Sequence, residues 1–91
     1  MKNYSINGAN CPDKMSLFKE FSTALNFPDY FGDNWDSFEE IMFDLPNIKN
    51  LFITNFDSLL TEKQNDKEIF ESIIQAINAE GIYKIYKAEM I

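Results

Sequence analysis

Three short strand-like segments, widely spaced along the chain, limit its fold more than any other feature. They lie at about residues 4–6, 48–54 and 82–86, and they are rich in β-branched and aromatic residues. Parallel strands need connections of about a dozen residues or more, and the intervening segments exceed that length. The pattern predicts an α/β fold, a three-stranded parallel sheet packed with three to four helices. At 91 residues, we expect a single domain spanning residues 1–91.

The segments between these strands predict helices, because their apolar residues recur at three- and four-residue spacing. We expect helices at residues 13–25, 33–45 and 66–80, and one helical turn at 56–60. Asp33 or Asn34 caps the second helix, Pro46 ends it, and Gly81 closes the third. Expected core residues are Leu17, Phe18, Phe21, Ala24 and Leu25 in the first helix, Ile69, Phe70, Ile73, Ala76 and Ile77 in the third, the Leu51–Ile53 run, and Tyr83 and Tyr86 in the last strand.

Charge and composition narrow the function classes. The net charge is −7, with eight lysines and no arginine, which argues against direct nucleic-acid binding and favours a basic protein partner. Solubility alone is the simpler explanation of that charge. Histidine is absent, which lowers the expectation of catalysis, and we expect no cofactor. Cys11 is the only cysteine, and no apolar run reaches membrane-spanning length, so we expect a cytoplasmic protein with no membrane association.

The acidic residues gather in one part of the chain. Residues 21–48 contain no lysine but six carboxylates, Asp29, Asp33, Asp36, Glu39, Glu40 and Asp44. On the second predicted helix, one side carries Trp35 at its edge with Phe38, Ile41, Met42 and Leu45, and the other carries Asp36, Glu39, Glu40 and Asp44 around Phe43. Such a helix can simply face water, and the helix dipole favours an acid at Asp36. A mixture of acidic and basic residues would keep the helix equally soluble without mutual repulsion. The uniform negative charge of this side therefore favours a role in binding a partner.

Residues 27–40, Phe-Pro-Asp-Tyr-Phe-Gly-Asp-Asn-Trp-Asp-Ser-Phe-Glu-Glu, resemble the signature of the barstar family, intracellular inhibitors of the secreted ribonuclease barnase. The resemblance extends more weakly over most of the chain. It implies that the acidic second helix and its preceding loop plug the active site of a small basic ribonuclease. It also assigns contacts to Tyr30, Asn34, Asp36 and Glu40, with Gly32, Trp35, Phe43 and Asp44 in neighbouring contact positions. We add Phe31 and Glu39 to these predicted partner-binding residues.

The sequence departs from the family pattern at four of these positions. Glu40 replaces an aspartate, Phe31 replaces a tyrosine, and Trp35 and Phe43 are larger than their counterparts in the family's best-known member. These departures suggest a cognate ribonuclease other than barnase, or another toxin.

Three hypotheses follow from the sequence. The leading one is a monomeric, non-enzymatic inhibitor that binds a basic secreted ribonuclease one to one. A second is an antitoxin or interaction module of the same fold with a non-ribonuclease target. The third is an enzyme or metal site built from Asp33, Asp36, Glu39 and Glu40, although no calcium-loop spacing is present.

Overall fold

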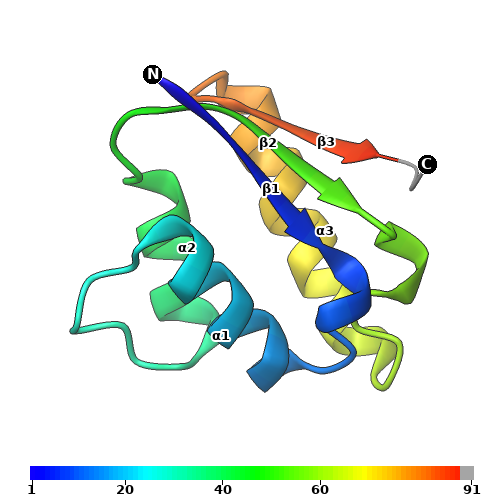
Figure 1. The fold of residues 1–91 in the computed structure, drawn as a ribbon. Coiled ribbons are helices and arrows are strands. Elements are labelled where there is room, and N and C mark those ends of the chain that lie inside the picture. The colour runs from blue at the N-terminus through cyan, green and yellow to red at the C-terminus, as the bar shows by residue number, and fades with distance from the viewer. Residues whose placement is uncertain (89–91) are drawn as a thin grey trace.

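The computed structural model of the chain describes residues 1–88, and it has the predicted α/β architecture (Figure 1). Three strands and three α-helices follow one another along the chain. In order they are β1 (Lys2–Asn7), α1 (Lys14–Leu25), α2 (Trp35–Phe43), β2 (Ile48–Thr54), α3 (Gln64–Glu80) and β3 (Lys84–Ala88). Short 3₁₀ turns, η1 (Gly8–Asn10) and η2 (Phe56–Ser58), follow β1 and β2.

The three strands form one parallel sheet in the order β1-β2-β3. Tyr4 lies beside Leu51, which lies beside Ile85, and this register continues to the carboxyl ends of the strands, whereas the β1–β2 register shifts between Lys2 and Asn3. Each crossover carries helical structure, α1 and α2 between β1 and β2, and α3 between β2 and β3, as parallel pairing requires. The predicted sheet topology is therefore confirmed.

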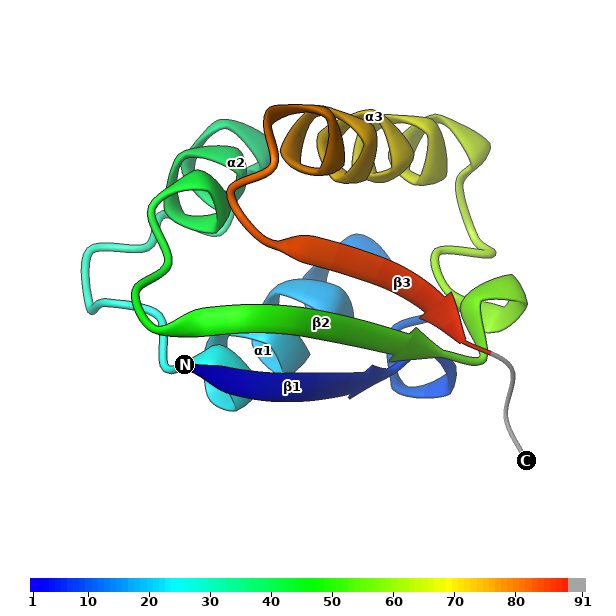
Figure 2. The same cartoon turned by 90° about the horizontal axis from the view of Figure 1, so that it is seen from above.

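The α-helices lie on the same face of the sheet, so that one face is buried and the other is more open (Figures 1 and 2). The alternation of buried and exposed side chains along the strands agrees with this arrangement. Ile6, Leu51, Ile53 and Ile85 are buried, whereas Tyr86, the neighbour of Ile85, is 46% exposed and stacks on Phe52. The buried strand residues join apolar residues from all three helices in one hydrophobic core.

Local sequence signals set the starts and ends of α1 and α3. Asp13 accepts a hydrogen bond from the Ser16 amide at 2.9 Å, and the Ser16 side chain accepts from the Asp13 amide, which makes a capping box. Gly81, at φ 71°, takes the left-handed conformation that closes α3. Helix α3 begins at Gln64, two residues before the predicted start, and the predicted turn at 56–60 is present as η2.

Two core predictions and one strand boundary were wrong: Ala24 and Tyr86 are exposed, Tyr86 by 46%, and the last strand starts later than expected. Ala24 is exposed, although its spacing placed it with Leu17 and Leu25. The last strand begins at Lys84, not at residue 82, because the chain needs Ile82 and Tyr83 to cross from α3 to the sheet. Tyr83 is buried as predicted, but from this connection. Helix α3 also aligns the new strand, since the Asn78 amide group hydrogen-bonds both the N–H and the carbonyl of Ile85, at 2.8 and 3.0 Å.

No helix within residues 1–88 is both long and apolar enough to cross a bilayer. Cys11 is fully buried and donates to the Asn7 carbonyl at 3.7 Å. Burial is the main reason why the pKa of this thiol rises to about 12, with a smaller contribution from the charge of Glu20.

Candidate functional site

The loop before α2 is fixed by two aromatic side chains that leave a third exposed. Asn26 ends α1 in the left-handed conformation, at φ 55°, and Phe27 turns into the core. Phe31 is partly buried and packs edge-to-face against Phe18 and Phe27, with ring centroids 5.4 and 5.1 Å apart. Tyr30, between these anchors, is 75% exposed. The loop therefore presents Tyr30 to solvent from a packed base.

Three short hydrogen bonds join this loop to the start of α2. Asn34 caps the helix by accepting from the Ser37 amide at 2.8 Å, and its side-chain N–H donates to the Gly32 carbonyl at 3.0 Å. The Gly32 amide donates to Ser37 Oγ at 3.0 Å. A Cβ at position 32 would lie 3.0 Å from Asn34 Nδ2, so a larger residue would disturb the cap. Of the two residues predicted as possible caps, Asn34 caps the helix, whereas Asp33, at φ 51°, lies outside it.

Helix α2 separates its apolar and acidic residues as predicted. Phe38, Ile41 and Met42 are buried in the core. The opposite side exposes the carboxylates of Asp36, Glu39 and Glu40, and Asp44 extends this exposed row at the C-terminal cap. We call these four carboxylates, together with exposed Tyr30, the acidic surface.

The acidic surface lacks internal charge compensation. Within residues 1–88 the single ion pair joins Lys87 to Glu71, and it involves none of these carboxylates. Like charges at helical spacing destabilise a helix by a few tenths of a kcal/mol per pair. The negative charge of the acidic surface is therefore not neutralised by an ion pair within residues 1–88.

Trp35 and Phe43 both belong partly to the core. Trp35 packs against Phe18 and Phe38, with centroids 5.0 and 5.5 Å apart, so its predicted place at the edge of the apolar stripe is confirmed. Phe43 was expected among the carboxylates, but it is partly buried and packs against the core. Phe31 is likewise packed. Three of the four departures from the family pattern thus lie at partly buried positions, and Glu40 is the exposed one.

Two side chains that the sequence analysis did not assign to the site fix the ends of α2. At its start, Trp35 Nε1–H donates to Asp66 in the first turn of α3, at 3.1 Å. At its end, the buried Tyr83 hydroxyl donates to the Met42 carbonyl at 2.7 Å. This bond satisfies one of the carbonyls that a helix end leaves without an internal partner. Burial raises the pKa of Tyr83, which keeps the hydroxyl protonated as a donor.

A family profile described as "Barstar (barnase inhibitor)" matches residues 1–86. The chain belongs to the barstar family. A search of curated proteins gave no match. Family membership agrees with the three-stranded parallel sheet and three α-helices, and it marks the chain as a member of a family described by inhibition of the ribonuclease barnase.

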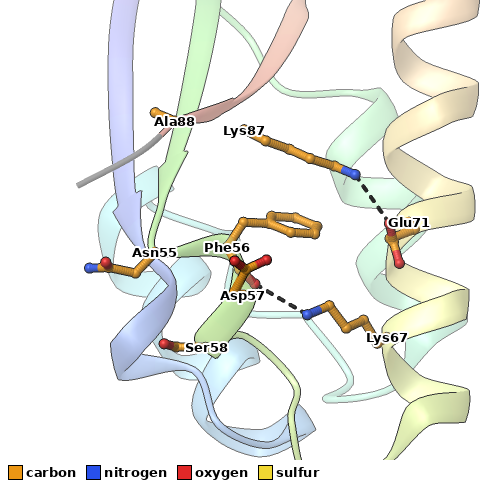
Figure 3. Close-up of a pocket in the computed structure, with 8 residues that line it drawn as sticks. All are labelled: Asn55, Phe56, Asp57, Ser58, Lys67, Glu71, Lys87 and Ala88. Carbon is orange, nitrogen blue, oxygen red and sulfur yellow. Dashed lines mark hydrogen bonds and ion pairs between the residues drawn. The ribbon is translucent and has the colours of Figure 1, made fainter.

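This barstar-family chain also has a cavity away from the acidic surface. The cavity, about 390 Å³, lies where β2 and β3 end, between η2 and α3 (Figure 3). Lys87 and Lys67 both lie near the Phe56 ring, with Nζ 4.5 and 5.2 Å from its centroid. Each also has an internal partner, since Lys87 pairs with Glu71 at 3.1 Å and Lys67 donates to the Phe56 carbonyl at 3.3 Å. These contacts join η2 and β3 to α3.

The acidic residues do not converge on a metal-binding point. Among residues 1–88, no three histidine, cysteine, aspartate or glutamate side chains form a group that could hold a metal ion. Asp33 lies before the helix, while Asp36, Glu39 and Glu40 project along it. The geometry is a row of separate carboxylates along one side of α2.

Proposed function

We propose that this barstar-family protein inhibits a basic ribonuclease by covering its catalytic cleft with the acidic surface. The observation that carries the proposal is the exposed, uncompensated row of carboxylates on α2 in a chain that matches the family over residues 1–86. Opposite charge on the two partners would supply attraction, orientation and specificity. The expected complex is one to one, with a monomeric free inhibitor.

Inhibition would follow from substitution of one anion for another. A ribonuclease must hold the phosphates of RNA with cationic side chains, and carboxylates of the inhibitor occupy the same positions. The inhibitor does not react, so it needs neither a cofactor nor a general base. This chemistry suits a chain without histidine.

The predicted binding residues divide into two roles in this proposal. Tyr30, Asp36, Glu39, Glu40 and Asp44 contact the ribonuclease directly, because their side chains are exposed. Gly32 and Asn34 are also exposed, and in this proposal they contact the ribonuclease while they fix the start of α2. Phe31, Trp35 and Phe43 are partly buried, so they add contacts at the edge of the interface and fix the loop and helix that carry the others. Glu40 replaces the family aspartate, so we assign it to the deepest cationic pocket of the partner.

The lone buried cysteine fits a reducing compartment. We therefore place the inhibitor in the cytoplasm of a cell that exports the ribonuclease, where it protects that cell's own RNA.

An RNA-cleavage assay with a panel of secreted, basic, guanyl-specific ribonucleases tests the proposal. We expect one or more enzymes to lose activity as the inhibitor approaches a one-to-one ratio, with a matching complex by size-exclusion chromatography. Glu40→Gln should relieve the inhibition, whereas Glu62→Gln, the same charge change at an exposed loop residue, should not. If no enzyme in the panel is inhibited and none forms a complex with the protein, the proposed function is contradicted.

One observation favours a second candidate, a toxin that is not a ribonuclease. Glu40 is an exposed departure from the family pattern, and its extra methylene changes the reach of the central carboxylate. Affinity capture from the producing organism, followed by mass spectrometry, separates the candidates. A captured basic protein without RNA-cleaving activity would favour the second one.

A further inference from the structure

A groove lies beside the acidic surface, where the loop before α2 meets the end of that helix. Its volume is about 280 Å³, and it is open to solvent. Its lining comes from two segments, Asn26, Pro28 and Tyr30 from the loop and Ile41, Asp44, Leu45 and Pro46 from the end of the helix. The groove is thus formed only when these two segments pack together.

The lining combines apolar walls with one negative charge. Pro28, Ile41, Leu45 and Pro46 supply hydrocarbon surface, and Asp44 supplies the only ionised group. Small-molecule sites usually measure about 300–1,000 Å³. The groove falls below that range, and its volume suits a single side chain better than a cofactor.

The charge of Asp44 is uncompensated in the folded chain. It forms no ion pair within residues 1–88, and no lysine lines the groove. It also caps the C-terminal end of α2, where the negative end of the helix dipole disfavours a carboxylate. A cation bound here would relieve both unfavourable interactions.

We propose that this groove receives an arginine side chain from the partner, as a contact separate from the pocket that receives Glu40. The partner's basic nature rests on the proposed function. The aliphatic stem of the arginine packs on Pro28 and Leu45, its guanidinium pairs with Asp44, and the Tyr30 ring offers an aromatic surface to the cation. Arginine fits better than lysine because its guanidinium is planar and more weakly hydrated.

An NMR titration tests the groove without any ribonuclease, so its outcome is independent of the proposed function. N-acetyl-arginine amide is added to the ¹⁵N-labelled protein at constant ionic strength. We expect saturable shifts at residues 26–30 and 44–47, with a dissociation constant of the order of 1 mM, as befits so small a ligand. N-acetyl-lysine amide, which has the same charge, should bind several-fold more weakly.

Two variants serve as matched comparisons in this titration. Asp44→Asn should abolish saturation without lowering the melting temperature, because Asp44 is exposed and destabilises its helix end. Glu62→Gln, with the same loss of charge elsewhere, should bind the arginine derivative like the parent protein. Absence of saturation, or equal binding by Asp44→Asn, would overturn the groove assignment. Equal affinity for the lysine derivative would overturn the choice of arginine.

A ribonuclease found by the inhibition assay then tests the groove within a complex. Asp44→Asn should weaken the complex about tenfold and mainly raise the dissociation rate, with inhibition retained at high inhibitor concentration. Double-mutant cycles against the partner's arginines should identify one that loses its coupling in Asp44→Asn. Additive effects for every arginine would refute the contact while leaving the inhibition itself intact.

Discussion

Glu40 lies on the exposed side of α2, opposite the buried residues Phe38, Ile41 and Met42. Removal of one charge from a desolvated pair across an interface typically costs about 2–5 kcal/mol of binding free energy. We therefore expect Glu40→Ala to weaken the ribonuclease complex by that amount, measured by titration calorimetry. The melting temperature of Glu40→Ala should change little, because the Glu40 side chain makes no hydrogen bond or ion pair within residues 1–88.

Glu40→Asp tests the reach of this side chain, since it restores the residue that the family pattern has at this position. If Glu40→Asp keeps the affinity, the negative charge at this position matters more than the length of the side chain that carries it. A large loss of melting temperature in Glu40→Ala, with unchanged affinity, would reverse the assignment of Glu40 to the interface.

Cys11 makes the folded state sensitive to alkaline pH. Its folded pKa is about 12 against 9.0 for an unperturbed thiol, so the folded chain keeps a proton that the unfolded chain loses. The protonated Cys11 thiol therefore contributes its full stabilisation of the folded state below pH 9, and this stabilisation declines as the pH rises toward 12. Urea denaturation in a reducing buffer should show about 1 kcal/mol less stability at pH 10 than at pH 7. Cys11→Ala should lose less over the same interval, and equal losses would contradict this account.

At the scale of elements, the two ends of α2 explain how so short a helix keeps a fixed orientation. The helix has nine residues, too few to be stable alone. It is held by packing, by the Trp35–Asp66 hydrogen bond at its start and by the Tyr83–Met42 hydrogen bond at its end. A helix fixed in this way would bind the proposed partner at a lower ordering cost.

Tyr83→Phe tests the hydrogen bond at the helix end while it retains the buried ring. We expect a loss of about 1–3 kcal/mol in stability, because the Met42 carbonyl is left without its partner. Amide hydrogen exchange should quicken more in α2 than in β2. Tyr86→Phe, at an exposed position of β3, is the matched control and should change neither quantity. A uniform increase in exchange across the protein would indicate lost global stability without a role in fixing α2.

The positions of the helices and strands could be predicted from the sequence, because helix capping and hydrophobic periodicity depend on residues that are close together in the chain. Asn34, Pro46 and Gly81 each mark a boundary within a few residues, and the 48–54 strand matches β2. Periodicity gives the angle of a residue around its helix, but it does not say which neighbour covers that angle. Ala24 and Phe43 were misplaced for this reason.

The hydrogen bonds that fix the ends of α2 could not be predicted in the same way. The Trp35–Asp66 and Tyr83–Met42 hydrogen bonds join residues 31 and 41 positions apart in the chain. No periodicity relates such partners, because the tertiary fold alone brings them together. The exposed carboxylates were easier to identify, since their charge pattern lies within one helix.

The whole molecule has an uneven charge distribution that should govern its association kinetics. All eight lysines lie outside residues 21–48, which hold six of the fifteen acids. Opposite surface fields can raise association rates toward about 10⁸–10⁹ M⁻¹s⁻¹ at low salt, and barnase with barstar is itself a standard example. For the proposed complex of this chain with a ribonuclease, we expect added NaCl to slow association strongly and to change dissociation much less.

Stopped-flow mixing over a range of NaCl concentrations measures both rates. Glu39→Gln should lower the association rate and flatten its salt dependence, because it removes one charge from the acidic surface. Glu62→Gln removes the same charge elsewhere and should have a smaller effect, since a screened field weakens over about 10 Å at 0.1 M salt. Equal effects of the two variants would mean that net charge, rather than its placement on α2, directs the encounter.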